Sequence, residues 1–323
     1  MKSQIRPFNG RAAKSRRGIK FFPQLQTLRL GGLLALCLAA GGMAANAAVT
    51  TSSLMDQMTD LAGMAEFPQP AYTCKQFSSY DRKSVSPTQE WFANGDAGQY
   101  LRVEERNGRK EHVMMDTEGP GAIVRIWSAN PAGTLRIYID GAEQPVLEAE
   151  MSALLGGKFP GLPRPIAGEY SKGWNLYFPI PYAKHCKVTS DKGNFYYHVN
   201  YRTYAAGTAV ESFKLEQIQA LNSRIQKLAA RLDSPRGSDQ DLGNETQDYT
   251  MELAAGDTRR TEISGPRAIA WSALHVESAD RDAALRGIIV KITFDGEACV
   301  EAPLGDLFGN APGISPFATL PVG

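Results

Sequence analysis

Short runs of alternating apolar and polar residues cover most of the chain. They lie at residues 99–102, 112–115, 122–127, 135–139, 175–178, 186–189 and 195–204. Alternation with a period of two is typical of β-strands, and the Gly, Pro, Asn and Asp between the runs are turn residues. Many short strands without helices between them predict an all-β fold, a β-sandwich or jelly roll, rather than alternating strands and helices.

Two segments have helical spacing instead. Residues 50–67 predict a short helix that leads into the first strand. Residues 212–232 carry an apolar residue every three or four positions, which predicts one amphipathic helix with Ser212 as its cap. This helix can pack on the sheet of its own domain, the commoner arrangement, or at a subunit contact.

One pattern is written twice. Residues 119–141 read GPGAIVRIWSANPAGTLRIYIDG, and residues 265–296 repeat Gly-Pro, Ala-Ile, a nearby Trp and an apolar run that ends in Asp-Gly. The connector is nine residues longer in the second copy. Repetition over this length predicts two tandem jelly-roll modules, the second incomplete because few residues follow its copy. The expected division is 48–232 for the first module with its trailing helix, 233–247 for a linker and 248–323 for the partial second module.

The N-terminus has the order of an export signal, which is a basic stretch, an apolar stretch and a cleavage site. Basic residues up to Arg29 precede the apolar run 30–45, and Ala45-Asn46-Ala47 forms an A-x-A site. We therefore expect residues 1–47 to be removed and the protein to be periplasmic or secreted, with no membrane attachment after cleavage. The alternative is a membrane anchor, but the run is short for a span. Arg16-Arg17 also resembles a twin-arginine signal.

Composition narrows the classes of partner. The 323 residues carry a net charge of +1 with 43% hydrophobic residues, which gives no electrostatic reason to expect nucleic acid or an anionic membrane as partner. Beyond the signal only Cys74, Cys186 and Cys299 remain, and neither they nor the four scattered histidines have the spacing of a metal site. We expect no metal or cofactor, and at most one disulfide.

Carboxylates, arginines and aromatics near turns are the remaining material for chemistry, and they suit a carbohydrate site. Tyr80-Asp81-Arg82 is a compact polar group in which Arg82 could hold Asp81 ionised, although an ordinary turn with a surface ion pair is the simpler interpretation of the motif alone. Glu118 is either a turn residue or an acid at the sandwich rim. Trp127, on one strand face with Arg125, either stacks on a sugar or packs in the core.

Aspartates that follow strands complete the set of candidates. Asp306, between two glycines in PLGDLFG, is a ligand contact or a structural turn. Asp140 and Asp295 each precede Gly after a strand, and both are interpreted as hairpin turns.

Taken in order, the motifs SSYDR, EGPGAIVRIW, LRIYIDG, PIPYAKHCKV, YYHVNYRTY and PLGDLFG resemble glycoside hydrolase family 172, earlier catalogued as domain-of-unknown-function family 2961. The resemblance spans residues 77–309. It implies two jelly-roll modules, trimers or hexamers, no cofactor, and retaining exo-hydrolysis of α-D-fructofuranosides, difructose anhydrides or α-D-arabinofuranosides. The alternative is a non-catalytic carbohydrate-binding or remnant jelly roll.

The resemblance leaves the catalytic residues unassigned. It places the catalytic glutamates in a continuation beyond PLGDLFG, so no residue of this chain is matched to them, and the chain is expected to be C-terminally incomplete. Tyr80-Asp81-Arg82 and, in second place, Asp306 carry over as residues that line a pocket or an interface.

Overall fold

The computed structural model describes residues 3–4, 48–234, 247–269, 272–310 and 317–320. The chain divides into two compact units, one of residues 46–240 and 316–323 and the other of residues 1–45 and 241–315. We call residues 48–234 the sandwich unit and residues 247–310 the second unit. The predicted signal and most of the predicted linker lie outside the described residues.

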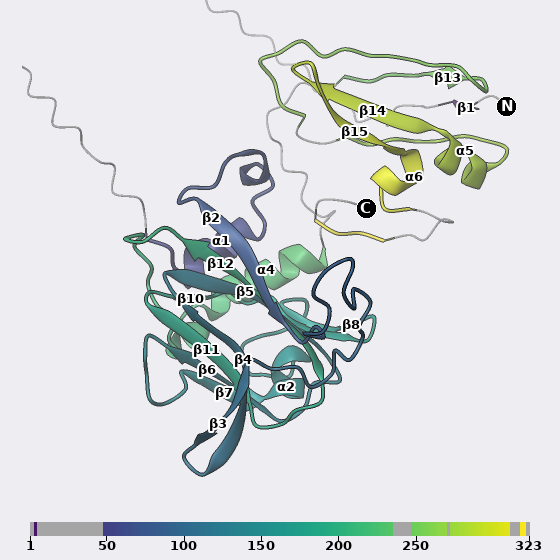
Figure 1. Cartoon of the computed structure of the whole chain (residues 1–323). Helices are drawn as coiled ribbons and strands as arrows, with labels where there is room; N and C mark the ends of the chain where they lie inside the picture. Colours follow the sequence, from purple (N-terminus) through teal and green to yellow (C-terminus); the bar gives the residue numbers. More distant parts are fainter. Residues whose placement is uncertain (1–2, 5–47, 235–246, 270–271, 311–316, 321–323) are drawn as a thin grey trace, which may run out of the picture. The chain divides into compact units, whose positions relative to one another are not determined.

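Two antiparallel sheets build the sandwich unit (Figure 1). The first sheet has the order β2-β12-β5-β9-β8, with β10 also pairing with β5; the second has the order β3-β4-β11-β6-β7. The first consists of β2 (Tyr72–Ser78), β12 (Tyr196–Tyr204), β5 (Gly121–Ala129), β9 (Gly173–Leu176), β8 (Ala167–Tyr170) and β10 (Ile180–Tyr182). The second consists of β3 (Arg102–Arg106), β4 (Arg109–Glu118), β11 (His185–Ser190), β6 (Thr134–Ile139) and β7 (Leu147–Glu150). The predicted β-sandwich is confirmed.

Alternation along the strands divides each sheet into a core face and an outer face. On β12, Tyr197, Val199 and Tyr201 are buried, whereas His198 and Asn200 between them are only partly covered. The inner residues of both sheets join in one hydrophobic cluster. Burying each such large side chain contributes roughly 1.5–3 kcal/mol to folding, so this cluster holds the two layers together.

The hairpin between β3 and β4 corrects one sequence prediction. Asn107 and Gly108 both have positive φ, 51° and 75°, as a two-residue type I′ turn requires. Because this turn fixes the register, the strand lies at Arg102–Arg106 and not at residues 99–102 as predicted. The Asn-Gly pair was visible in the sequence and is a strong hairpin signal.

A β-bulge marks the outer face of the first sheet. Asn200 pairs with Arg125 but Tyr201 pairs with Ile123, so Val124 is an extra residue on β5. A bulge bends its strand and re-aims side chains. Val124 lines two depressions beside this strand.

Short helices lie against the sandwich, and the first of them is shorter than predicted. Helix α1 spans Thr51–Gln57 and begins with a capping box between Thr50 and Ser53. A 3₁₀ turn, η1 (Gly63–Ala65), follows it. Helix α2 (Met151–Leu155) is capped by the Glu150 carboxylate, which accepts the N–H of Ala153 at 2.7 Å.

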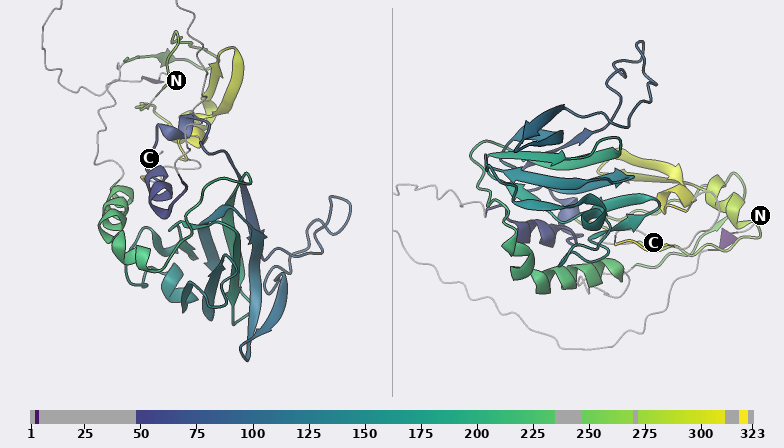
Figure 2. Two further views of the ribbon diagram at one scale, coloured as in Figure 1. Left: turned by 90° about the vertical axis from the view of Figure 1, so that its left-hand side faces the viewer. Right: turned by 90° about the horizontal axis from the view of Figure 1, so that it is seen from below.

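The single helix predicted at residues 212–232 is wrong in detail, because the structure has two helices. Helix α3 (Glu216–Ala220) ends at Leu221, and α4 (Asn222–Asp233) begins directly after it. Ser212 is not the cap: its hydroxyl donates to Asp140 and accepts the N–H of Ala183. Ile218, Ile225, Leu228 and Ala229 join the core, so the expected packing on the same domain is confirmed. Figure 2 shows α4 beside α1, where Arg224 pairs with Asp56.

The second unit contains a hairpin of β14 (Ile289–Phe294) and β15 (Glu297–Pro303). Helices α5 (Arg281–Gly287) and α6 (Leu304–Leu307) flank it, and a short β13 (Glu252–Leu253) pairs with β1 (Ser3–Gln4). Asp295-Gly296 forms the expected two-residue turn, with φ of 51° and 87°. Among the described residues, no helix is long and apolar enough to cross a membrane.

The sequence repeat is visible as a strand, Asp-Gly, a strand and a short helix in each copy: β6, β7 and α2, then β14, β15 and α6. Helix α5 occupies the longer connector of the second copy. Residues 265–269 and 272–276, which correspond to β5, form no strand. The division into two tandem modules stays a prediction.

Candidate functional site

The predicted group Tyr80-Asp81-Arg82 opens the long loop between β2 and β3. Asp81 is 6% exposed, and its carboxylate accepts the backbone N–H groups of Lys83 at 3.0 Å and Gly95 at 2.8 Å. These two hydrogen bonds lower the pKa of Asp81, and the charges of Lys83 and Arg82 add less. The carboxylate therefore closes the loop, and a contact between Asp81 and a sugar stays a prediction.

Arg82 does not form the predicted ion pair with Asp81. Its guanidinium lies 4.2 Å from the centre of the Tyr80 ring and donates to the Tyr80 carbonyl. Tyr80 itself is 54% exposed. The cation and the ring thus form one exposed stacked pair at the base of the loop.

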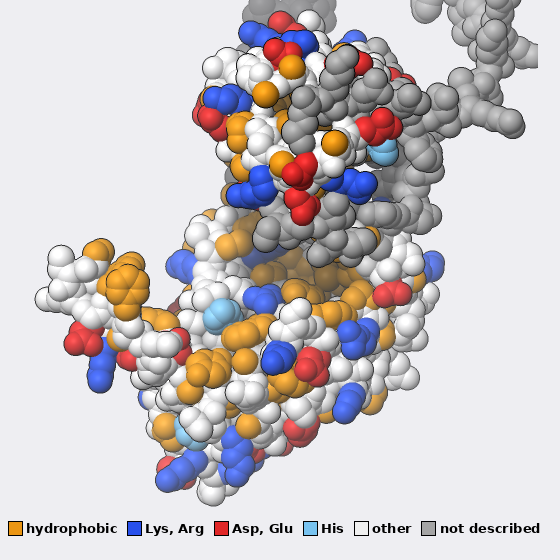
Figure 3. All heavy atoms as spheres, turned by 90° about the vertical axis from the view of Figure 1, so that its right-hand side faces the viewer, with side chains coloured by type: hydrophobic (Ala, Val, Ile, Leu, Met, Phe, Trp, Pro, Cys, Tyr) orange, Lys and Arg blue, Asp and Glu red, His pale blue; other side chains and the backbone are white. Residues whose placement is uncertain are grey.

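The tip of this loop carries hydrophobic side chains that the sequence analysis did not single out. Phe92 is 92% exposed, Val85 65% and Trp91 49%. Figure 3 shows a segment that projects from the sandwich unit and ends in hydrophobic side chains. A Ser84 hydroxyl bond to the Trp91 carbonyl, 2.8 Å long, holds the two sides of the tip together.

Glu118 precedes β5, and Trp127 lies near the far end of that strand. Glu118 is an exposed residue at the end of β4, just before β5 begins at Gly121. Trp127 lies six residues further along β5, which is roughly 20 Å of strand. The structure does not bring these two predicted residues together.

Asp306 belongs to the second unit. It lies in the first turn of α6 and forms an exposed ion pair of 2.6 Å with Arg286 of α5. This ion pair joins two short helices, which supports the interpretation of Asp306 as a structural residue over that as a ligand contact.

Trp127 lies on the outer face of the first sheet, half-buried and not in the core. Its ring is 4.7 Å from the ring of His198 on β12. Arg125, on the same strand face, donates to the Asn175 side-chain oxygen at 3.1 and 3.0 Å and to that of Asn200 at 3.5 Å. The predicted sharing of one face by Arg125 and Trp127 is confirmed.

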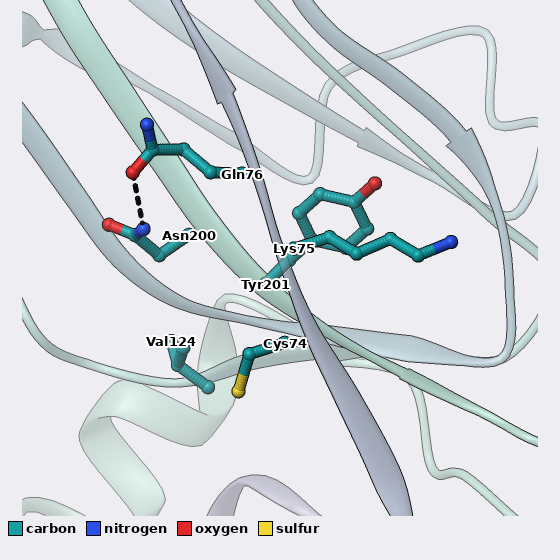
Figure 4. A pocket seen from close by; sticks show the side chains of 6 residues that line it. All are labelled: Cys74, Lys75, Gln76, Val124, Asn200 and Tyr201. Carbon is teal, nitrogen blue, oxygen red and sulfur yellow. Dashed lines mark hydrogen bonds between the residues drawn. The ribbon is translucent and has the colours of Figure 1, made fainter.

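Two depressions lie next to this group, and Figure 4 shows the first of them. One has a volume of about 340 Å³, and the other, of about 220 Å³, lies toward α1. The first is lined by Cys74, Lys75, Gln76, Val124, Asn200 and Tyr201. In Figure 4 the Gln76 and Asn200 amides point toward one another and share a hydrogen bond of 2.8 Å, while Lys75 and Tyr201 extend to the other side of β2.

Comparison with known families identifies the sandwich. Residues 70–221 match the family model described as the GH172 first beta-sandwich domain, which begins just before β2 and ends between α3 and α4. This part of the chain belongs to glycoside hydrolase family 172. No curated protein matches the chain.

Membership of GH172 indicates a carbohydrate substrate, so the carboxylates need examination as acids and nucleophiles. Glu104 and Glu111 lie directly opposite one another on β3 and β4. The Cβ atoms of residues so placed are about 5 Å apart, so their carboxyl groups can approach the separation of about 5–5.5 Å that retaining hydrolases use. Placement alone therefore makes them candidates.

Their surroundings argue against that role in this GH172 protein. Burial would raise the pKa of Glu111, but hydrogen bonds from Thr189, Arg109 and Tyr138 outweigh it and leave the pKa lowered. The pKa of Glu104 is lowered in the same way, because hydrogen bonds from Lys187 and Arg102 outweigh the effect of its desolvation. A general acid needs a raised pKa, so this pair is a structural ion network.

Six carboxyl groups of the described residues have a resolved pKa shift, and in each the pKa is lowered: Asp81, Glu104, Glu111, Asp116, Glu150 and Asp191. Within the same residues, no three His, Cys, Asp or Glu side chains are grouped as a metal site. Cys186 is buried, whereas Cys74 and Cys299 are exposed; all three are free. The described structure thus assigns no catalytic residue.

Proposed function

We propose that this GH172 protein is an exported glycoside hydrolase that removes α-D-furanosyl groups from chain ends with retention. The observation that carries the proposal is the match of residues 70–221 to the GH172 first β-sandwich domain. The furanose specificity and the retention rest on the resemblance of the ordered motifs. Candidate substrates are α-D-fructofuranosides, difructose anhydrides and α-D-arabinofuranosides.

The sandwich unit supplies substrate contacts in this proposal, and none of its described residues is assigned to proton transfer. Retention requires one carboxylate as nucleophile and a second carboxyl group as acid and base, about 5–5.5 Å apart. Tyr80 and Trp127 offer partly exposed aromatic rings for sugar contact. Glu118 and Asp306 stay candidate contacts, while Asp81 and Arg82 shape the loop beside Tyr80.

Turnover of defined furanosides tests the proposal. The folded chain would be incubated with a chromogenic α-D-arabinofuranoside and, separately, with a difructose anhydride; the matching arabinopyranoside serves as the control for ring size. We expect release from one furanoside only, with the α-anomer appearing first in the NMR spectrum. Turnover of neither by folded protein would favour the alternative, a non-catalytic carbohydrate-binding jelly roll.

Export and assembly are separate parts of the proposal. A signal at residues 1–47 predicts that protein from the exported fraction of its host begins at Ala48. Intact mass measurement checks this, and retention of the segment would support the membrane anchor instead. Sedimentation of the recovered protein checks the trimer or hexamer that the resemblance implies.

A further inference from the structure

The outer face of the first sheet is a regular grid of aromatic and polar side chains. One row crosses five strands in register: Ser78, His198, Trp127, Asn175 and Gly168. A second row, two residues along, contains Gln76, Asn200 and Arg125. On the other side of the first row lie Tyr196 and Tyr170, both more than a third exposed.

Trp127 is held flat within this grid. A Cβ on Gly173 would come within 2.4 Å of the Trp127 ring nitrogen, so the indole lies directly against the β9 backbone. His198 covers the neighbouring side at a ring distance of 4.7 Å. Burial, followed by the charge of Arg125, lowers the pKa of His198, so this imidazole is neutral at neutral pH. An aromatic ring fixed in this way is a preorganised stacking surface.

Three arginines on or beside this face have only neutral partners. Arg125 bonds the Asn175 and Asn200 amides, Arg202 bonds the Gln57 amide at 2.5 Å, and Arg164 bonds the Glu169 backbone carbonyl at 3.2 Å. Arg202 and Arg164 also stack on Tyr72 and Tyr170. Within the described residues, none of the three forms an ion pair with a carboxylate.

On the second sheet, most Arg and Lys side chains are paired with carboxylates. On its outer face Arg102, Arg109, Arg136 and Lys187 each form an ion pair with a carboxylate, whereas Arg106 donates to the Glu143 carbonyl and stacks on Tyr138. Most of the positive charge on this face is therefore paired with carboxylates, while that of the three arginines on the first sheet is not. A surface with aromatic platforms and unneutralised guanidinium groups is complementary to an anion that also has flat apolar faces.

We propose that the outer face of the first sheet binds an acidic glycan strand, a saccharide chain that carries carboxylate groups. Sugar rings stack on Trp127 and on the flanking Tyr170 and Tyr196, the partly exposed Gln76 and Asn200 amides meet hydroxyl groups, and the arginines meet the carboxylates. From Tyr196 to Arg202 the face extends six residues along β12, roughly 20 Å, which accommodates several sugars. Such a site is independent of turnover: it anchors the protein on a polymer and uses no acid or base.

Single-stranded nucleic acid also combines stacking with negative charge. The glycan is favoured because residues 70–221 match a domain of a glycoside hydrolase family.

Calorimetric titration of the whole protein with an oligogalacturonate tests the proposal, with its methyl ester as a neutral partner of equal length and linkage. We expect binding of the acid, at least about tenfold weaker binding of the ester, and loss of affinity as salt rises. Exposed Arg164→Gln should weaken binding about three- to tenfold, because one charge-assisted contact is lost. Arg106→Gln on β3 of the second sheet is the matched control, because Arg106 also bonds a backbone carbonyl and stacks on a tyrosine ring; it should leave affinity unchanged.

Four results would overturn the proposal: no binding of the acid, equal binding of acid and ester, equal losses in the two arginine variants, or tighter binding of a single-stranded oligonucleotide. Trp127→Phe provides a second variant that keeps the fold, and it should weaken the acid and the ester alike. Because no step of the titration requires turnover, its failure is distinguishable from failure to cleave furanosides.

Discussion

The Asp81 carboxylate accepts the backbone N–H of Gly95 at 2.8 Å and thereby joins two ends of a loop that are fourteen residues apart. The same side chain also accepts the N–H of Lys83. These bonds make Asp81 the closure of the loop that displays Trp91 and Phe92. The position of those rings therefore depends on a side chain that does not touch them.

Asp81→Asn should open this loop, because an amide is a weaker acceptor than a carboxylate for two N–H groups. Amide exchange at Lys83 and Gly95 should accelerate while exchange in β12 stays slow, as hydrogen exchange with mass spectrometry would measure. Asp60→Asn is a matched control, since Asp60 caps an exposed turn at Gly63. Unchanged exchange at Gly95 would remove Asp81 from its role in closing the loop.

The outer face of the second sheet predicts loss of stability in acid. Glu104, Glu111 and Asp116 have lowered pKa values in the folded state, each because hydrogen bonds and basic partners outweigh burial. Their contribution is present above the unfolded pKa values, near pH 4, and is lost as pH falls further. Urea unfolding at pH 7 and pH 3 should show a clearly lower free energy of unfolding at pH 3.

The Glu111→Gln variant tests whether this network, and not the overall charge repulsion of the protein at low pH, causes the loss of stability in acid. Glu111 is fully buried and bonds Tyr138, Thr189 and Arg109, so the change should cost about 2–4 kcal/mol at neutral pH. It should also reduce the difference in unfolding free energy between pH 7 and pH 3. The same difference in variant and wild type would show that Glu111 is not the responsible group.

Gly173→Ala should displace the Trp127 indole, because the added methyl group would lie 2.4 Å from the ring nitrogen. We expect a loss of about 1–3 kcal/mol in stability, as for overpacking, together with altered tryptophan fluorescence and weaker binding of the acidic glycan. Gly287→Ala is the control, since a Cβ there meets no atom within 4 Å. Unchanged fluorescence in Gly173→Ala would contradict the flat placement of Trp127.

Asp140 joins the β6 turn to the segment that leads into α3. Its carboxylate accepts the N–H groups of Lys184 and His185 and the Ser212 hydroxyl. Asp140→Ala should cost about 2–3 kcal/mol, because it removes these bonds and places Ala at a φ of 56°. Asp140→Asn keeps an acceptor and tolerates that φ, so thermal unfolding should show a smaller loss. Equal losses would mean that neither the retained acceptor nor the tolerance of this φ matters, and that the carboxylate charge of Asp140 is what the turn requires.

Periodicity was sufficient for the sandwich but not for its details. The alternation in β12 and the spacing of Ile218, Ile225 and Leu228 predict burial correctly, because burial of alternate or every third to fourth residue is what a core requires. The break at Leu221 could not be predicted, because α3 and α4 share one continuous apolar face. The spacing of apolar residues along such a face does not change where the backbone angles change.

The candidate site was predictable only in part. Trp127 and Arg125 share a face because a strand has a period of two, and that follows from sequence. His198 beside Trp127 and Asn175 beside Arg125 come from distant segments, and only strand order and register bring them together. The hydrogen bonds of Asp81 to Gly95 depend on the loop conformation, which no local pattern specifies.

The helices at the two ends of the sandwich unit determine where this domain can be cut. Residues 70–221 cover all its strands but exclude α1 and α4, which supply Leu54, Met55, Ile225 and Leu228 to buried clusters. A fragment confined to those limits would expose the apolar surface that the helices cover and would tend to aggregate. Autonomous folding therefore requires residues 48–234, a longer segment than the residues 70–221 that match the family model.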